Sequence, residues 1–201
     1  MRVKEGNKEK DILEAAIKMF AKMGFHQTKI SKIAETAGIA TGSVYLYFKN
    51  KDAILLKIFE ELWQTIYLET KSLAKRSDIN AVEKFENLLD IIFDLFVQNP
   101  HLAVVISSEE HYLLRGKRSN FTDFYEKFLD IGEEIINEGI KNKLINPNLD
   151  IKVFRNFAFG GLRHLLHLWA RNPNDYPLTN MRQNIKFILK KGILANNNFY
   201  H

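Results

Sequence analysis

The chain has 201 residues, of which 46% are hydrophobic and 26% are charged. This composition excludes a disordered chain and favours a globular protein of one or two domains, because so much apolar surface can offset the entropy lost on folding. The absence of cysteine excludes disulfides, thiolate metal sites and cysteine nucleophiles. No stretch is apolar enough for a membrane helix and the first residues lack an export signal, so we expect a cytoplasmic protein without a membrane partner.

The net charge of +5 comes from one end of the chain. Residues 1–59 hold 11 Lys or Arg and 6 Asp or Glu, whereas the remaining residues are neutral overall. A basic segment on a neutral body indicates a head that binds a polyanion such as nucleic acid. A solvated, lysine-rich surface gives the same count, so charge alone leaves both interpretations open.

Apolar spacings of three and four predict an all-α protein of about nine helices, since no segment shows the alternation of a strand. The first helix is predicted over residues 8–23. A short second helix, capped by Thr28 or Ser31, ends near residue 37, and a third covers about residues 41–48. Asn50 is a candidate N-cap for a fourth helix over residues 51–75. Longer helices, of lengths that suit a bundle, are predicted over residues 79–98, 101–114, 120–143, 150–171 and 178–195.

Two short helices joined at Gly38 form the pattern of a helix-turn-helix unit. We expect a small core of apolar side chains between these helices and the first one. Its predicted members are Ala16, Phe20, Ile33, Ala37, Ile39, Val44 and Phe48. This packing leaves hydroxyls, a glycine and tyrosines on the outside, at the N-terminal end of a short helix that suits a major groove.

The motifs AAIKMF in the first helix and ISKIAETAGIATGSVYLYFKNKDAILL over residues 30–56 resemble the TetR family of bacterial one-component repressors. The resemblance is specific for about residues 8–57. It implies an all-α fold with an N-terminal three-helix DNA-binding domain over residues 1–50. A larger helical domain for ligand binding and dimerisation would occupy residues 51–201. It further implies a homodimer that a small-molecule effector releases from double-stranded operator DNA.

The resemblance also implies which side chains contact DNA. The implied positions are Thr28, Lys29, Thr41, Gly42, Ser43, Tyr45, Tyr47 and Lys51. Lys51 also has an independent reason to bind phosphate, because a cation at a helix N-terminus is a ready anion site. The alternative for the two tyrosines is that they only cover the small core.

The second half of the chain is rich in aromatic residues, with 11 of the 15 phenylalanines after residue 59. They form either a core or the lining of an apolar cavity between helices. The segments NPHLAVVISSEE, LLRGKR and FRNFAFGGLRHLLHLWARNP resemble a TetR subgroup that represses fatty-acid degradation genes and binds long-chain acyl-CoA. The predicted ligand contacts are Phe96, Val104, Phe124, Phe128, Ile131, Phe157, Leu165 and Trp169, with Arg115 near the nucleotide phosphates. The basic cluster of Arg115, Lys117 and Arg118 is equally consistent with a solvated turn.

The last two predicted helices carry apolar stripes that two protomers could pair into a four-helix bundle. These stripes are Leu162, Leu165, Leu166 and Trp169 on one helix and Met181, Ile185, Ile188 and Leu189 on the other. A dimer is also a geometric need, because two recognition helices must lie about 34–36 Å apart to reach successive major grooves.

The competing hypothesis is a helical lipid- or acyl-thioester-binding protein, or an enzyme, with an accessory basic head. The sequence lacks the nucleophile elbow, the P-loop and the dinucleotide fingerprint, and its acid–base cluster is Glu109, Glu110 and His111. We therefore expect that the protein is not an enzyme and binds no cofactor. His164 and His167 lie three residues apart, which is weak support for a metal site, so none is expected.

Overall fold

The computed structural model describes the backbone of residues 8–114 and 120–194 and the side chains of residues 8–108 and 122–194. Within these ranges the chain forms nine helices: α1 (Lys8–Met23), α2 (Ile30–Ala37), α3 (Thr41–Val44), α4 (Lys51–Ala74), α5 (Ala81–Gln98), α6 (Pro100–Leu114), α7 (Asn120–Lys141), α8 (Ile151–Arg171) and α9 (Leu178–Ile193). The β-type pairing among the described residues is one isolated bridge between Ile145 and Leu194. The predicted all-α class is confirmed.

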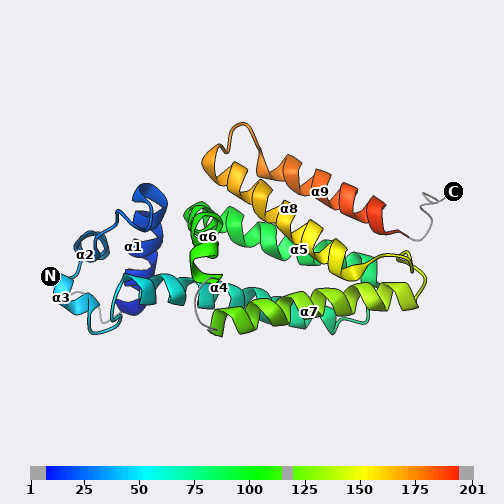
Figure 1. Ribbon diagram of the computed structural model, residues 1–201, viewed down its shortest axis with the longest axis horizontal. Helices are drawn as coiled ribbons and strands as arrows, with labels where there is room; N and C mark the ends of the chain where they lie inside the picture. Colours follow the sequence, from blue (N-terminus) through cyan, green and yellow to red (C-terminus); the bar gives the residue numbers. More distant parts are fainter. Residues whose placement is uncertain (1–7, 115–119, 195–201) are drawn as a thin grey trace.

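Helices α1, α2 and α3 form a small head at one end of the molecule, and α5 to α9 form a larger body (Figure 1). Helix α4 leaves the head and continues beside α7, so it packs against α1 at one end and against α5 and α7 further along. A second contact between head and body joins α1 to α6. Helix α4 begins just after the predicted domain boundary at residue 50 and contributes side chains to both parts. The boundary itself stays a prediction.

Polar side chains and one glycine set the helix ends. The Asn50 side chain accepts a hydrogen bond of 2.8 Å from the backbone N–H of Ala53, which confirms Asn50 as the N-cap of α4. Asn80 and Glu83 form a reciprocal capping box at the start of α5. Gly38 ends α2 with a left-handed φ of 70°, a conformation that costs glycine little.

Two predictions about the short helices were wrong in detail. The N-cap residue of α2 is Lys29, and no side chain caps that helix. Helix α3 is α-helical only to Val44, because the backbone N–H groups of Leu46 and Tyr47 bond to carbonyls three residues earlier, the pattern of a turn. The recognition segment is therefore a single helical turn followed by an exposed turn.

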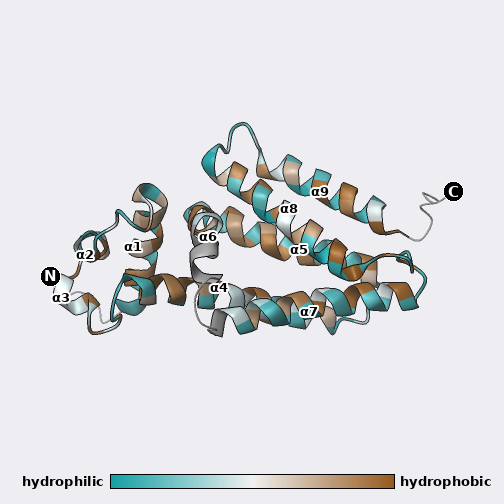
Figure 2. Ribbon diagram, viewed as in Figure 1, coloured by the Kyte–Doolittle hydropathy of each residue, from teal (hydrophilic) through white to brown (hydrophobic). Residues whose placement is uncertain are grey.

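The apolar core continues from the head into the body. Fully buried side chains include Ile12 and Ile33 in the head, Ile54 and Phe59 on α4, and Phe93 on α5. The predicted head residues also belong to this cluster, although two of them are only partly buried: Ala16, Phe20, Ile33, Ala37, Ile39, Val44 and Phe48. Hydrophobic and hydrophilic segments alternate along the longer helices such as α7, α8 and α9 (Figure 2).

No single helix within the described ranges is long and apolar enough to cross a bilayer. Helix α5 and residues 100–108 of α6 meet the length and hydropathy requirement only as a pair. The chain bends by 109° between them.

Helix α9 is held on α5 by a ladder of ion pairs. Carboxylates four residues apart on α5 face cations four residues apart on α9, so the two helices run in opposite directions along the ladder. The pairs are Glu86–Lys190 at 3.2 Å, Asp90–Lys186 at 2.7 Å, Asp90–Arg182 at 3.5 Å, and Asp94–Arg182. Because Asp90 serves two cations, its carboxylate is the centre of the ladder.

We expect Asp90→Asn to lower the free energy of unfolding by about 1 kcal/mol, because partly exposed ion pairs each contribute about 0.2–1 kcal/mol and two are lost. Urea unfolding followed by circular dichroism measures the loss, and added salt should reduce it by screening. The control is Glu14→Gln, whose carboxylate lies 3.9 Å from Lys10 in an exposed pair and should matter little. Equal losses in the two variants would contradict the role of the ladder.

Candidate nucleic-acid interface and ligand cavity

The outer side of α3 and the turn after it is an exposed surface on the head. Val44 and Phe48 point into the core, whereas the side chains of Tyr45 and Tyr47 are 55% and 44% exposed. The same surface carries polar residues at the start of α3, of which Ser43 is partly buried. We call these residues the recognition surface: Thr41, Gly42, Ser43, Tyr45 and Tyr47. The sequence prediction that this side faces outward is confirmed.

Gly42 is not required by the packing of the protomer. A Cβ atom built at Gly42 would meet no atom within 4 Å, and its φ does not lie in the left-handed region. A larger side chain would therefore fit the protomer but would project from the recognition surface. Such a glycine is expected where the backbone of one molecule closely approaches another.

The ammonium group of Lys51 is occupied within the head. Its Nζ donates to the backbone carbonyls of Phe25, His26 and Thr28 at 2.5, 3.0 and 2.9 Å, and it lies 4.5 Å from the centre of the Phe25 ring. A lysine ammonium has three hydrogens, so all three have acceptors. We call this set of contacts the Lys51 clamp. It ties the start of α4 to the turn between α1 and α2.

Thr28 strengthens the same turn from inside. Its side chain is buried, and its hydroxyl lies within donating distance of the carbonyls of Gly24 at 2.8 Å and Met19 at 3.2 Å. The sequence suggested that Thr28 and Lys51 contact phosphate. Both contacts stay predictions, and the structure gives each side chain acceptors in the head instead. Lys29, beside them, is exposed.

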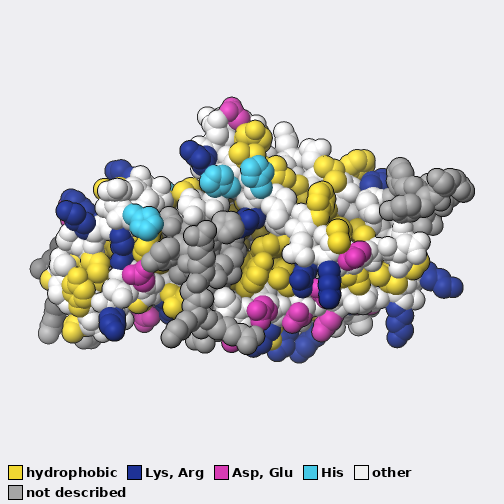
Figure 3. All heavy atoms as spheres, in the orientation of Figure 1, with side chains coloured by type: hydrophobic (Ala, Val, Ile, Leu, Met, Phe, Trp, Pro, Cys, Tyr) yellow, Lys and Arg dark blue, Asp and Glu magenta, His cyan; other side chains and the backbone are white. Residues whose placement is uncertain are grey.

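A cavity lies between α5, α7 and α8, with about 540 Å³ of empty space when the part open to solvent is included. Hydrophobic side chains gather in the hollow between α8 and α7 on the face shown in Figure 3. Its described lining is Phe85, Leu88, Leu89 and Ile92 on α5, Phe128, Leu129, Gly132, Glu133 and Ile136 on α7, and Ile151, Phe154, Arg155, Ala158, Phe159 and Leu162 on α8. Of the two interpretations that the sequence left open for the aromatic residues, a core and a cavity lining, the structure contains both.

The predicted ligand residues only partly coincide with this cavity. Phe128 lines it, whereas Phe157 is 70% exposed on the opposite side of α8. Arg115 lies outside the described residues. The other predicted residues are buried or half-buried but do not belong to the described lining: Phe96, Val104, Phe124, Ile131, Leu165 and Trp169. These ligand contacts therefore stay predictions, and of the described ones only Phe128 lines this cavity.

The cavity wall contains an ion pair that the sequence did not predict. Arg155 Nη1 on α8 donates to Glu133 Oε1 on α7 at 2.6 Å. The Nε of Arg155 is buried and has no hydrogen-bond partner among the described residues. These two residues are 22 positions apart in the sequence, so no local spacing predicts their contact. The one sequence signal was an arginine next to an apolar stripe.

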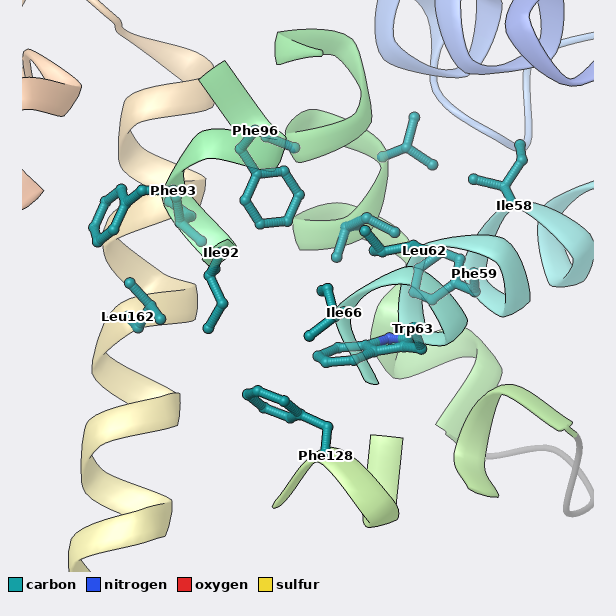
Figure 4. Packing of buried hydrophobic residues seen from close by; sticks show 14 of the residues in the cluster. Ile58, Phe59, Leu62, Trp63, Ile66, Ile92, Phe93, Phe96, Phe128 and Leu162 are labelled. Atoms are coloured by element: carbon teal, nitrogen blue, oxygen red, sulfur yellow. The ribbon is translucent and has the colours of Figure 1, made fainter. Parts of the chain in front are cut away.

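Aromatic rings connect the cavity wall to α4. The Trp63 ring on α4 lies 5.6 Å from the Phe128 ring and 5.9 Å from the Phe159 ring, and both phenylalanines line the cavity. Tyr125 packs edge-on against Trp63 at 4.8 Å. Figure 4 shows Trp63 and Phe128 turned toward one another with Ile66 beside them. The cavity wall and α4 are therefore in direct contact through these rings.

The outer sides of α8 and α9 carry apolar side chains that the protomer does not cover. Val153 and Phe157 on α8 and Phe187 and Ile188 on α9 are each more than half exposed. Most of the stripe predicted for dimerisation is instead buried inside the protomer: Leu162, Leu166, Trp169, Met181, Ile185 and Leu189. The predicted helices thus do expose apolar surface, but of the predicted stripe residues only Ile188 belongs to it.

No group of three or more His, Cys, Asp or Glu side chains within the described part of the chain could hold a metal ion. His164 is exposed, and burial lowers the pKa of His167, with smaller contributions from the nearby charges. The side chains of Glu109, Glu110 and His111 lie outside the described residues.

The chain matches known protein families along most of its length. Residues 12–58 match the family described as bacterial regulatory proteins, tetR family, and residues 59–192 match the C-terminal region of YsiA-like proteins. The chain belongs to the tetR family of bacterial regulatory proteins. It is 31% identical over 182 residues to the fatty acid metabolism regulator protein of Bacillus subtilis strain 168, covering 90% of this chain and 93% of that one.

Two solved structures of this tetR-family type are similar along nearly their whole length. The fatty acid degradation regulator FadR of Bacillus halodurans has a TM-score of 0.80 and 26% identity, covering 98% of this chain and 100% of its own. FadR of Bacillus subtilis, solved in complex with stearoyl-CoA, has a TM-score of 0.77 and 30% identity, covering 92% and 98%. The resemblance seen in the sequence is confirmed.

We expect Lys51→Met to lower the free energy of unfolding by about 2 kcal/mol, because a hydrogen bond from a charged donor contributes about 1.5–3 kcal/mol and water replaces only part of what is lost. Urea unfolding in the absence of DNA measures the change. The matched control is Lys49→Met, since Lys49 is exposed and near the same surface. Unchanged stability of the Lys51 variant would show that the clamp does not hold the head.

Proposed function

We propose that this protein is a homodimeric repressor that binds double-stranded operator DNA and is released by a long-chain acyl-CoA. The observation that carries the proposal is the course of α4, which connects the head bearing the recognition surface to the wall of an apolar cavity. Binding to chromosomal operators would place the protein in the cytoplasm. The family is one of regulators, and we propose no enzymatic step.

The recognition surface supports the DNA-binding part. Its hydroxyls and phenols can donate to phosphate oxygens and base edges, and the open space at Gly42 allows close approach of a DNA strand. Lys29 and Lys49 are exposed beside it and would add sequence-independent attraction. Lys51 would mainly stabilise the fold of the head, and its positive charge would attract DNA phosphates from a longer distance.

The exposed apolar residues of α8 and α9 support the homodimer. A second copy of the chain would remove Val153, Phe157, Phe187 and Ile188 from water, and exposed apolar clusters of this kind are typical of interfaces. The twofold symmetry of such a pair presents two heads to one face of the DNA, as two half-sites require.

The cavity supports an effector with a long apolar chain. Thirteen of its fifteen described lining residues are apolar or glycine, and burial of hydrocarbon is favourable in proportion to its area. The relative from Bacillus subtilis was solved with stearoyl-CoA, which combines such a chain with a large polar head. We propose the same class of molecule for this chain.

The route from cavity to DNA runs through α4. An acyl chain against Phe128 and Phe159 would press on Trp63, which lies about 18 Å along α4 from Lys51 at the helical rise of about 1.5 Å per residue. The Lys51 clamp would then carry the movement of α4 to the head. Release follows if the effector favours the conformation whose head spacing does not fit the operator.

We expect Tyr47→Ala to weaken binding to an operator duplex by about tenfold or more, because phenol contacts to the strand are lost while the core is untouched. Fluorescence anisotropy with a duplex selected by the protein itself measures the affinity, which should fall steeply with salt. Tyr176→Ala, which removes a similarly exposed tyrosine before α9, is the control. Equal effects of the two changes, or no binding by the wild type, would refute the assignment of the surface.

We expect Gly132→Leu to abolish release by stearoyl-CoA and to leave operator binding intact. A Cβ at Gly132 meets no atom within 4 Å, so a leucine side chain can occupy the cavity that the acyl chain needs. Gly132→Ala is the matched control and should respond almost like the wild type. The measurement is operator anisotropy during titration with stearoyl-CoA. Release of free CoA by the purified protein would favour the competing hypothesis of an acyl-thioester enzyme.

A further inference from the structure

Leu46, in the turn after α3, is the most exposed large apolar side chain within the described residues. It is 83% exposed, and its neighbours Tyr45 and Tyr47 are 55% and 44% exposed. Single exposed apolar residues are common on proteins, whereas adjacent ones indicate a surface that another molecule covers. The phenols can form hydrogen bonds with a partner, but the leucine side chain has no donor or acceptor, so it needs an apolar contact.

The backbone directs Leu46 away from the core of the head. The segment keeps its right-handed winding through Phe48, because Tyr45 has α-helical dihedral angles and the N–H of Phe48 donates to the carbonyl of Val44 at 3.0 Å. Val44 and Phe48 are buried on one side of this winding. With about 3.6 residues per turn, Leu46 lies on the opposite side, which it shares with Gly42 four residues earlier.

The same side allows a partner to come close to the backbone. A Cβ atom built at Gly42 would meet no atom within 4 Å, so the side chain of Leu46 does not cover the glycine. A rigid surface that approaches the backbone at Gly42 would therefore also meet the leucine beside it.

The charge of the head favours DNA as the partner of this side. The excess of positive charge lies in residues 1–59, and Lys49 is exposed three residues after Leu46. The major groove of DNA admits a helix, and the base edges there carry polar donors and acceptors together with one apolar group, the C5-methyl group of thymine. Among the groups on the base edges, this methyl group is the one that matches a leucine side chain.

We propose that Leu46 is a specificity-determining residue that contacts the C5-methyl group of a thymine in each half-site of the operator. The inference rests on the proposed DNA-binding function and deepens it, since it names a base that the operator must present to the leucine. The contact removes hydrocarbon of both molecules from water, which favours thymine over a base without a methyl group. Contacts of the phenols with phosphate position the head but cannot make this distinction.

The test replaces thymines with deoxyuridine, which lacks only the C5-methyl group, in a duplex selected by the full-length protein. Each replacement is made at equivalent positions of both half-sites, and fluorescence anisotropy at a fixed salt concentration measures the affinity. At one such position the wild type should lose about fourfold in affinity for each methyl group removed, as expected for one buried carbon. Leu46→Ala should bind the thymine duplex more weakly than the wild type and should lose nothing further at that position.

Leu68→Ala is the matched control, because Leu68 is a leucine of α4 that is 54% exposed and lies far along the chain from the recognition surface. This variant should keep the affinity of the wild type and its sensitivity to deoxyuridine. Urea unfolding should show equal stability of the Leu46 variant and the wild type, since the leucine side chain is exposed.

Equal losses in the wild type and in Leu46→Ala at every thymine would assign the effect to the shape of the duplex and would overturn the inference. A selected duplex without thymine, or binding by the wild type that deoxyuridine does not weaken, would overturn it as well, while the proposed function stands. Absence of duplex binding by the wild type would overturn the proposed function and the inference with it.

Discussion

Three hydrogen bonds from the Lys51 ammonium hold the head on the helix that leads to the body. The carbonyls of Phe25, His26 and Thr28 lie in the turn between α1 and α2, where no helical N–H is available to them. One cation therefore completes the turn and at the same time anchors the first residue of α4. The orientation of the recognition surface relative to the rest of the molecule depends on this contact.

The other end of α4 meets an environment of a different kind. There Trp63 packs among aromatic rings that also form the cavity wall, so the helix has a polar anchor near the head and an apolar contact near the ligand. Helix α4 runs without interruption between these two contacts. The contact of α1 with α6 gives the head a second support on the body.

The cavity separates two tasks that ligand recognition requires. Apolar side chains on α5, α7 and α8 provide affinity in proportion to buried area and distinguish poorly between molecules with similar chains. Buried polar groups distinguish well, because an unmatched hydrogen bond or charge is costly. Glu133 and Arg155 are the charged residues that the described wall contains.

The sequence by itself determined most features that depend on neighbours within a few positions, although the cap of α2 and the length of α3 differed from the prediction. Helix-spaced apolar residues predicted the helices, Asn50 predicted the start of α4, and the pattern around Gly38 predicted that Tyr45 and Tyr47 lie on the outside of the head. Such features follow from bonds and contacts three or four residues apart. Tertiary packing decided which apolar face of each helix meets which neighbour.

Only the tertiary structure showed that Lys51 serves carbonyls 23 to 26 positions earlier in the chain, and that α8 turns Phe159 toward the cavity and Phe157 away from it. A helix inside a bundle touches several neighbours, so its apolar residues cover more than one face and periodicity cannot assign each face to a partner. The Glu133–Arg155 pair exists because two helices bring opposite charges together, and no local pattern records that meeting.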